Sequence, residues 1–94
     1  MKLPERRSEV RVRLSVVLRI KGKDADGKPF DVLTAADDIS ASAFLCNCIV
    51  PLERDTVVDV FLRGKVEAPA GRARLVRTEH KDTPYQRHAF KFVG

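Results

Sequence analysis

The stretch Val10-Arg11-Val12-Arg13-Leu14-Ser15-Val16-Val17-Leu18-Arg19-Ile20 has an apolar residue at every even position. Four of its five odd positions carry arginine or serine. A period of two places successive side chains on opposite faces of an extended chain, and it fits no helical repeat. The stretch therefore predicts a β-strand with one face packed on a core.

Further short apolar runs, separated by turn residues, follow this strand. Asp26-Gly27 is typical of a hairpin turn. We predict the other strands through Phe30–Thr34, over Ile39–Val50 as one strand or a pair, and over Val57–Leu62, Arg72–Thr78 and Gln86–Phe92, with Gly64–Gly71 as a loop. About six short antiparallel strands favour a small all-β barrel, which leaves few sheet edges exposed.

Length and composition limit the function. The chain has 94 residues, 44% hydrophobic and 33% charged, so its core is small and a large active-site cavity would compete with it. No nucleophilic triad pattern occurs, and we expect no enzymatic activity. The longest uncharged run, Ile39–Leu52, has 14 residues and is too short for a membrane-spanning helix. Since no apolar signal opens the chain, we expect a cytoplasmic protein without membrane insertion.

The positive charge is concentrated near the start of the chain. The net charge is +5, yet residues 1–23 contain eight lysines and arginines and only two carboxylates. A basic end on a nearly neutral body indicates a localised anion site rather than a general nucleic-acid coat. Arginine supplies 11 of the 18 cations, and its planar guanidinium can bind phosphate or a guanine edge through two parallel hydrogen bonds.

The two cysteines allow two interpretations. Cys46 and Cys48 are two residues apart, so on a strand they share one face, and with His80 and His88 they could form a zinc site. Neither the Cys-x2-Cys nor the His-x3-His spacing of structural zinc sites occurs. We therefore favour buried packing cysteines, and expect no metal and no cofactor.

Two short motifs carry complementary chemistry. Arg7 and Arg11 are four residues apart, which places both side chains on one face of an extended or helical segment. Asp38 and Ser40 are two apart and share one face if the segment is a strand. A carboxylate can accept the two N–H donors of guanine's Watson–Crick edge, and arginine can donate to O6 and N7. Together these residues suit a guanine nucleotide.

On these motifs the sequence resembles the PilZ domain family, bacterial receptors for cyclic di-GMP. Its Arg-x3-Arg signature resembles Arg7 and Arg11, and its Asp/Asn-x-Ser-x2-Gly signature resembles Asp38, Ser40 and Ala43, with alanine replacing the glycine. Glu5-Arg6 is similar to the family's usual lead-in. Arg72–Arg77 and His88–Phe92 are similar to its last two strands, with Ala89 again in a glycine position.

The resemblance implies a Greek-key barrel over residues 12–94 preceded by a ligand-wrapping segment over residues 1–11, together one domain. It implies that Arg7 and Arg11, with Arg6, bind phosphate and a guanine edge, and that Asp38 and Ser40 meet a guanine. A C-terminal helix, often present in the family, is not expected before Gly94. The implied function is a cyclic di-GMP receptor that relays to a separate, unidentified protein.

Ala43 leaves two alternatives open. If its position needs positive φ or a close approach of the ligand, alanine weakens binding, and in the extreme the domain is degenerate and acts by protein contacts alone. Otherwise Ala43 lies in an ordinary strand, facing the core alongside Ile39 and Ala41.

A third hypothesis is a small barrel that binds single-stranded nucleic acid. Such barrels stack bases on surface aromatics. Tyr85 is the evident candidate, because the five phenylalanines lie in apolar strand patterns and are expected in the core.

Overall fold

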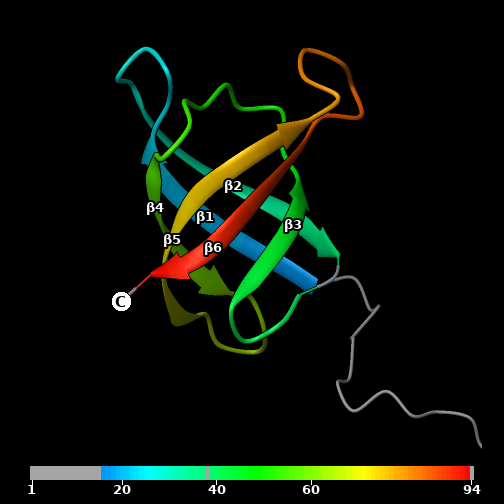
Figure 1. The fold of residues 1–94 in the computed structure, drawn as a ribbon. Helices are drawn as coiled ribbons and strands as arrows, with labels where there is room; N and C mark the ends of the chain where they lie inside the picture. The colour runs from blue at the N-terminus through cyan, green and yellow to red at the C-terminus, as the bar shows by residue number, and fades with distance from the viewer. Residues whose placement is uncertain (1–15, 38, 94) are drawn as a thin grey trace, which may run out of the picture.

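The computed structural model describes residues 16–37 and 39–93, which form a closed barrel (Figure 1). The strands are β1 (Val16–Lys23), β2 (Pro29–Asp37), β3 (Ala43–Asn47), β4 (Val57–Leu62), β5 (Ala68–Glu79) and β6 (Arg87–Val93). Neighbours are antiparallel throughout, in the order β1-β2-β3-β6-β5-β4, and β4 closes the barrel on β1. A fourth strand beside the first is the Greek-key arrangement. The predicted all-β barrel is confirmed.

The described part of the chain contains no helix. Accordingly, it has no helical segment long and apolar enough to cross a membrane.

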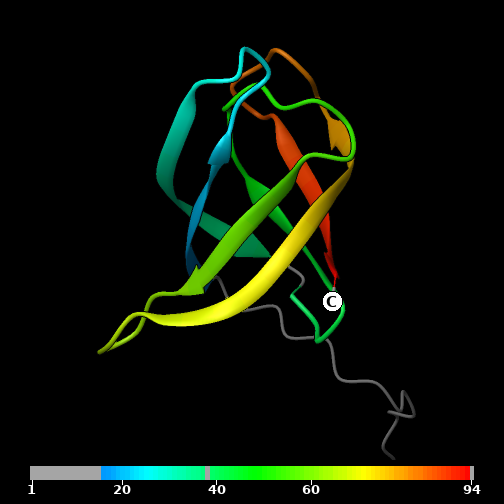
Figure 2. The same cartoon turned by 90° about the vertical axis from the view of Figure 1, so that its left-hand side faces the viewer.

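The two ends of the barrel carry different segments (Figures 1 and 2). At one end lie the start of β1, the turn 39–42 before β3, and the end of β6; we call this the Ser40 end. At the other end lie the β1–β2 hairpin tip, the β3–β4 connection and the β5–β6 loop; we call this the loop end. Any ligand of the turn 39–42 is therefore separated from the loop end by the length of the strands.

The alternating pattern is confirmed where the structure describes it. Leu18 and Ile20 are buried, whereas Arg19 and Lys21 face outward. Arg19 donates to Asp31 and Glu67 on the outer surface at 2.8 and 2.7 Å. The hairpin turn is also as predicted, since Gly27 has a φ of 80° and the Asp24 carboxylate accepts from two backbone N–H groups in the turn.

Two strand predictions are wrong in their extent. The predicted strand over Ile39–Val50 shrinks to β3, because residues 40–42 form a turn and the chain leaves the sheet after Asn47. The predicted loop over Gly64–Gly71 contains the first residues of β5, which pair with the end of β4. Pro69 is tolerated there beside a register shift at Val60/Phe61, where the hydrogen-bond ladder is already irregular.

The core is formed by inward-facing residues of all six strands. Its buried members are Leu18, Ile20, Ala36, Phe44, Cys46, Cys48, Val58, Val60, Ala73, Leu75 and Phe90. Phe44 and Phe90 stack with ring centroids 5.2 Å apart. Phe30 and Phe92 pack against this cluster. The expectation for Phe61 is wrong: it pairs with Arg19 on the outer face, under the Lys21 ammonium.

The backbone pairing between β2 and β3 covers fewer residues than the pairing between any other two neighbouring strands. β2 pairs with β1 from Pro29 to Ala36, but with β3 only at Ala36 and Asp37. The Thr34 hydroxyl extends this seam by donating to the Asn47 carbonyl. β3 ends at Asn47, so in the described chain no backbone ladder joins β3 to the part of β2 from Pro29 to Ala35.

Candidate functional site

The turn 39–42 is organised by Ser40. Its backbone N–H donates to the Ala43 carbonyl at 2.9 Å, and its hydroxyl oxygen accepts from the Ala43 and Ser42 N–H groups at 3.2 and 3.3 Å. The Phe92 N–H donates to the Ser42 carbonyl at 2.8 Å and fixes the turn to β6. Ser40 is exposed. The hydroxyl also donates to the Ala43 carbonyl at 3.3 Å. All three of these hydroxyl contacts are at the long end of hydrogen-bond distances, so a ligand can compete for the hydroxyl.

Ala43 is the first residue of β3 and lies opposite Lys91. The described non-glycine residues with positive φ are Asp55, His80 and Asp82, so Ala43 is not strained in that sense. Its neighbour Phe44 points into the core, and Ala43 therefore lies on the outer face, half-buried. The prediction that Ala43 is an ordinary strand residue is thus confirmed for its backbone. The prediction that its side chain faces the core alongside Ala41 is wrong. Ala41 is exposed, and the side chains that point inward from this strand are those of Phe44 and Cys46.

The remaining predicted binding residues lie outside the described residues. These are Arg6, Arg7, Arg11 and Asp38. The first described residue, Val16, lies at the Ser40 end of the barrel (Figure 1). An open cavity of about 380 Å³ occupies this end, lined by Ser40 and by apolar residues that include Ile39, Leu62 and Phe92. Of the predicted site, the structure describes Ser40 and Ala43 and brings those two into contact.

The cysteines are packing residues. Cys46 and Cys48 are free, buried and part of the core. Burial raises the pKa of the Cys46 thiol to about 12, with a further contribution from Cys48. In residues 16–37 and 39–93, no group of three His, Cys, Asp or Glu side chains lies close enough to hold a metal ion.

His88 is the most deeply buried of three buried polar residues in the described chain, the others being Thr34 and Gln86. It is 1% exposed, and one ring nitrogen, Nε2, lies 2.8 Å from the Val50 carbonyl, to which it donates. The Thr78 hydroxyl therefore donates to Nδ1 at 2.9 Å. Burial lowers the pKa of His88 below its ordinary value of 6.5, although the Val50 carbonyl opposes this.

The lowered pKa predicts a stability that falls on acidification. Because the unfolded chain takes up a proton on His88 at higher pH than the folded barrel, the free energy of unfolding decreases as the pH drops below 6.5. One proton gives a slope of at most about 1.4 kcal/mol per pH unit. Urea unfolding between pH 7.5 and pH 5 measures it. His88→Gln should flatten this slope and exposed His80→Gln should not; equal slopes in all three proteins would contradict the assignment.

Tyr85, the stacking candidate, is 76% exposed. It lines a shallow groove of about 570 Å³ with Asp37, Asn47, His80, Pro84 and Arg87. The Arg87 guanidinium, however, is paired with the Asp37 carboxylate at 3.1 Å. This carboxylate neutralises the guanidinium that lines the groove, which disfavours a phosphate backbone along it.

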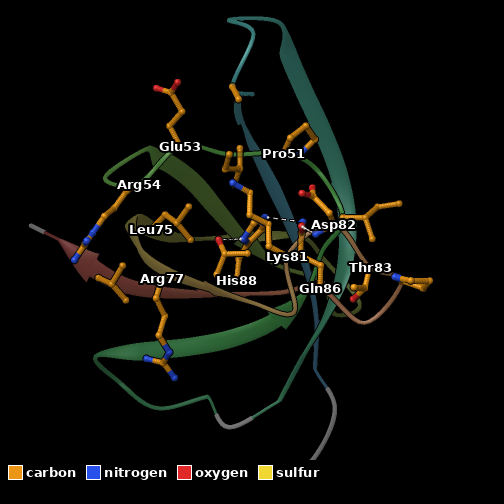
Figure 3. Close-up of a pocket in the computed structure, with 16 residues that line it drawn as sticks. Pro51, Glu53, Arg54, Leu75, Arg77, Lys81, Asp82, Thr83, Gln86 and His88 are labelled. Atoms are coloured by element: carbon orange, nitrogen blue, oxygen red, sulfur yellow. Dashed lines mark hydrogen bonds between the residues drawn. The ribbon is translucent and has the colours of Figure 1, made fainter.

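Sequence reasoning missed a larger cavity at the loop end. It has a volume of about 1020 Å³ and lies between the β3–β4 connection and the β5–β6 loop (Figure 3). Its walls come from segments about 30 residues apart in the chain, so no local motif marks it. The three described non-glycine residues with positive φ, Asp55, His80 and Asp82, all lie in the two segments that frame it.

No family model, curated protein or solved structure matches this chain.

Proposed function

We propose that this protein is a cyclic di-GMP receptor of the PilZ type that relays the level of the second messenger to a separate protein. The observation that supports it best is that the start of β1 and the Ser40 turn lie at the same end of the barrel. The chain enters β1 at Val16, on the same end of the barrel as the Ser40 turn (Figure 1). Arg11 precedes Val16 by five residues, so it can lie no more than about 18 Å from the strand start. The two motifs can therefore act on one ligand.

Each group has a defined role in this proposal. Arg7 and Arg11 bind the phosphates and a guanine edge, and Arg6 adds positive charge. Asp38 accepts from the guanine Watson–Crick edge, and Ser40 adds a hydroxyl beside it. Exposed Ser40 and outward-facing Ala43 both carry small side chains, which leave room for a planar base beside the turn. This arrangement binds and senses a nucleotide, and it contains no group assigned to bond breaking.

Titration calorimetry of the full chain tests the proposal. At about 150 mM salt, cyclic di-GMP should bind more tightly than a single-stranded oligonucleotide carrying the same number of phosphates. Guanine recognition survives electrostatic screening, whereas diffuse attraction to a basic segment does not. Tighter binding of the oligonucleotide would reject the proposal and favour the single-stranded nucleic-acid function.

Ala43→Gly separates a functional receptor from a degenerate domain. Since Ala43 has no positive φ to relieve, only the removal of its outward methyl can help the ligand. We expect cyclic di-GMP binding to tighten by up to about tenfold, and the free energy of unfolding to fall by about 0.5–1 kcal/mol, because glycine weakens a strand. Calorimetry and urea unfolding measure the two effects. A lower stability with an unchanged dissociation constant would favour a nucleotide-independent adaptor.

A further inference from the structure

Hydrogen bonds within the fold fix the segments that surround the loop-end cavity. Gln86, buried in the β5–β6 loop, donates its side-chain amide to the Cys48 carbonyl at 3.0 Å, and its amide oxygen accepts from the Asp82 N–H at 2.9 Å. On the other side, the Ala25 N–H donates to the Pro51 carbonyl at 2.9 Å. These bonds tie three separate segments into one rim. The cavity is therefore built into the resting fold rather than opened by a ligand.

The side chains on the floor of the cavity are either apolar or already have hydrogen-bond partners within the protein. Leu75 is buried at its base, and the neighbouring His88 has both ring nitrogens occupied by Thr78 and Val50. Ile49, at the rim, is 72% exposed. Further apolar lining comes from Pro51, Leu52, Val76 and Pro84. Because no polar group of the floor needs a partner, the interior suits an apolar body.

The charged side chains around the cavity differ in whether they are free to bind a ligand. Arg77 donates to Glu79 through two nitrogens at 3.0 and 2.9 Å. Glu53 and Arg54 point away from the cavity in Figure 3, whereas Lys81 extends over it. The ion pairs found within the described chain include neither Lys81 nor Arg54, so the direction of the side chain in Figure 3 makes Lys81 the unpaired cation that reaches over the cavity. Two acids line the cavity, Glu53 and Asp82, and Asp82 is the one next to Lys81 in the chain.

From this geometry we infer that the loop-end cavity binds an amphipathic carboxylate, with an apolar body over Leu75 and Ile49 and the acidic head on the Lys81 ammonium. The volume of about 1020 Å³ is ample for a medium-chain acyl group. This site is at the opposite end of the barrel from Ser40, and it does not depend on nucleotide binding.

Backbone amide NMR of the full chain, titrated with octanoate and decanoate below their micelle-forming concentrations, tests the site. We expect shifts concentrated in residues 49–55 and 80–86. Affinity should rise about three- to fourfold per methylene, roughly tenfold from octanoate to decanoate. Decyltrimethylammonium, with the same tail and the opposite charge, should bind more weakly. Shifts scattered over the barrel, or equal binding of the cation, would overturn the proposal.

Three exposed positions give variants that leave the core intact. Lys81→Gln should weaken decanoate about two- to fivefold, and Asp82→Asn should strengthen it by a similar factor, because the pair acts with opposite sign on an anionic head. Ile49→Ser should weaken it through lost apolar contact. Lys91→Gln on β6, the matched control, should have no effect. If Lys81→Gln and Lys91→Gln act alike, Lys81 does not hold the head group and the assignment is wrong.

Discussion

Alanine in place of Arg11 is expected to abolish detectable binding of cyclic di-GMP. Arg11 is assigned a bidentate, charge-assisted contact with the ligand. Losing such a contact costs about 1.5–3 kcal/mol, and more where a phosphate is left unpaired. This corresponds to a dissociation constant raised by about tenfold to more than a hundredfold. Titration calorimetry on the full chain measures it, with circular dichroism to verify that the barrel is unchanged.

Arg13→Ala is the matched control. Arg13 carries the same charge two residues further along the chain and matches neither motif. We expect its removal to alter affinity only slightly, through the general positive potential. Should the two substitutions weaken binding equally, the basic segment attracts anions without a defined contact, and the proposed role of Arg11 fails.

Phe90→Ala is expected to cause the largest loss of stability. Phe90 is 1% exposed, stacks on Phe44 and meets the His88 ring edge-on at 6.1 Å between centroids. Removing a buried phenylalanine leaves a cavity and costs about 3–5 kcal/mol, a large part of the stability of a small domain. The free energy of unfolding from urea titration gives the value.

Phe61→Ala provides the comparison within the same barrel. Phe61 lies on the outer face of β4, with the Lys21 ammonium 5.1 Å from its ring centroid. Its loss removes partly solvated surface and a weak cation–π contact, so we expect about 1 kcal/mol. Similar losses for Phe61→Ala and Phe90→Ala would show that the core is not organised around the Phe44–Phe90 stack.

The sequence predicted the regular part of the fold well. β4 begins and ends as predicted, because Val57–Leu62 is bounded by turn residues and its alternation is strong. The strand predictions fail where apolar residues occupy both faces of a segment, so that either face could pack on the core. Between Ile39 and Asn47 both parities contain apolar residues, and the larger Phe44 takes the core position. Because the turn at residues 40–42 interrupts the strand, the alternation before it does not fix the register after it.

The candidate nucleotide site was partly accessible to sequence reasoning. Short motifs identify residue types at fixed spacing, and the contact of Ser40 with Ala43 follows from their closeness in the chain. Their orientation does not follow, since the outward position of Ala43 depends on its pairing with β6. The loop-end cavity was beyond reach for a similar reason: Gln86 and Cys48 form its frame across 38 residues of sequence, and only the closed barrel places them together.

The short β2–β3 seam gives the barrel an uneven resistance to opening. β2 is held along its length by β1, but its other edge from Pro29 to Ala35 has no strand partner in the described chain. We expect amide hydrogens on that edge to exchange with solvent through small local openings, and therefore faster than the amide hydrogens paired between β5 and β6. Pro29 has no amide hydrogen and Asp31 carries charge, so this edge also resists the addition of a foreign strand. We therefore expect the fastest hydrogen exchange among the strands along this edge of β2, which runs from the loop end toward the Ser40 end (Figure 1).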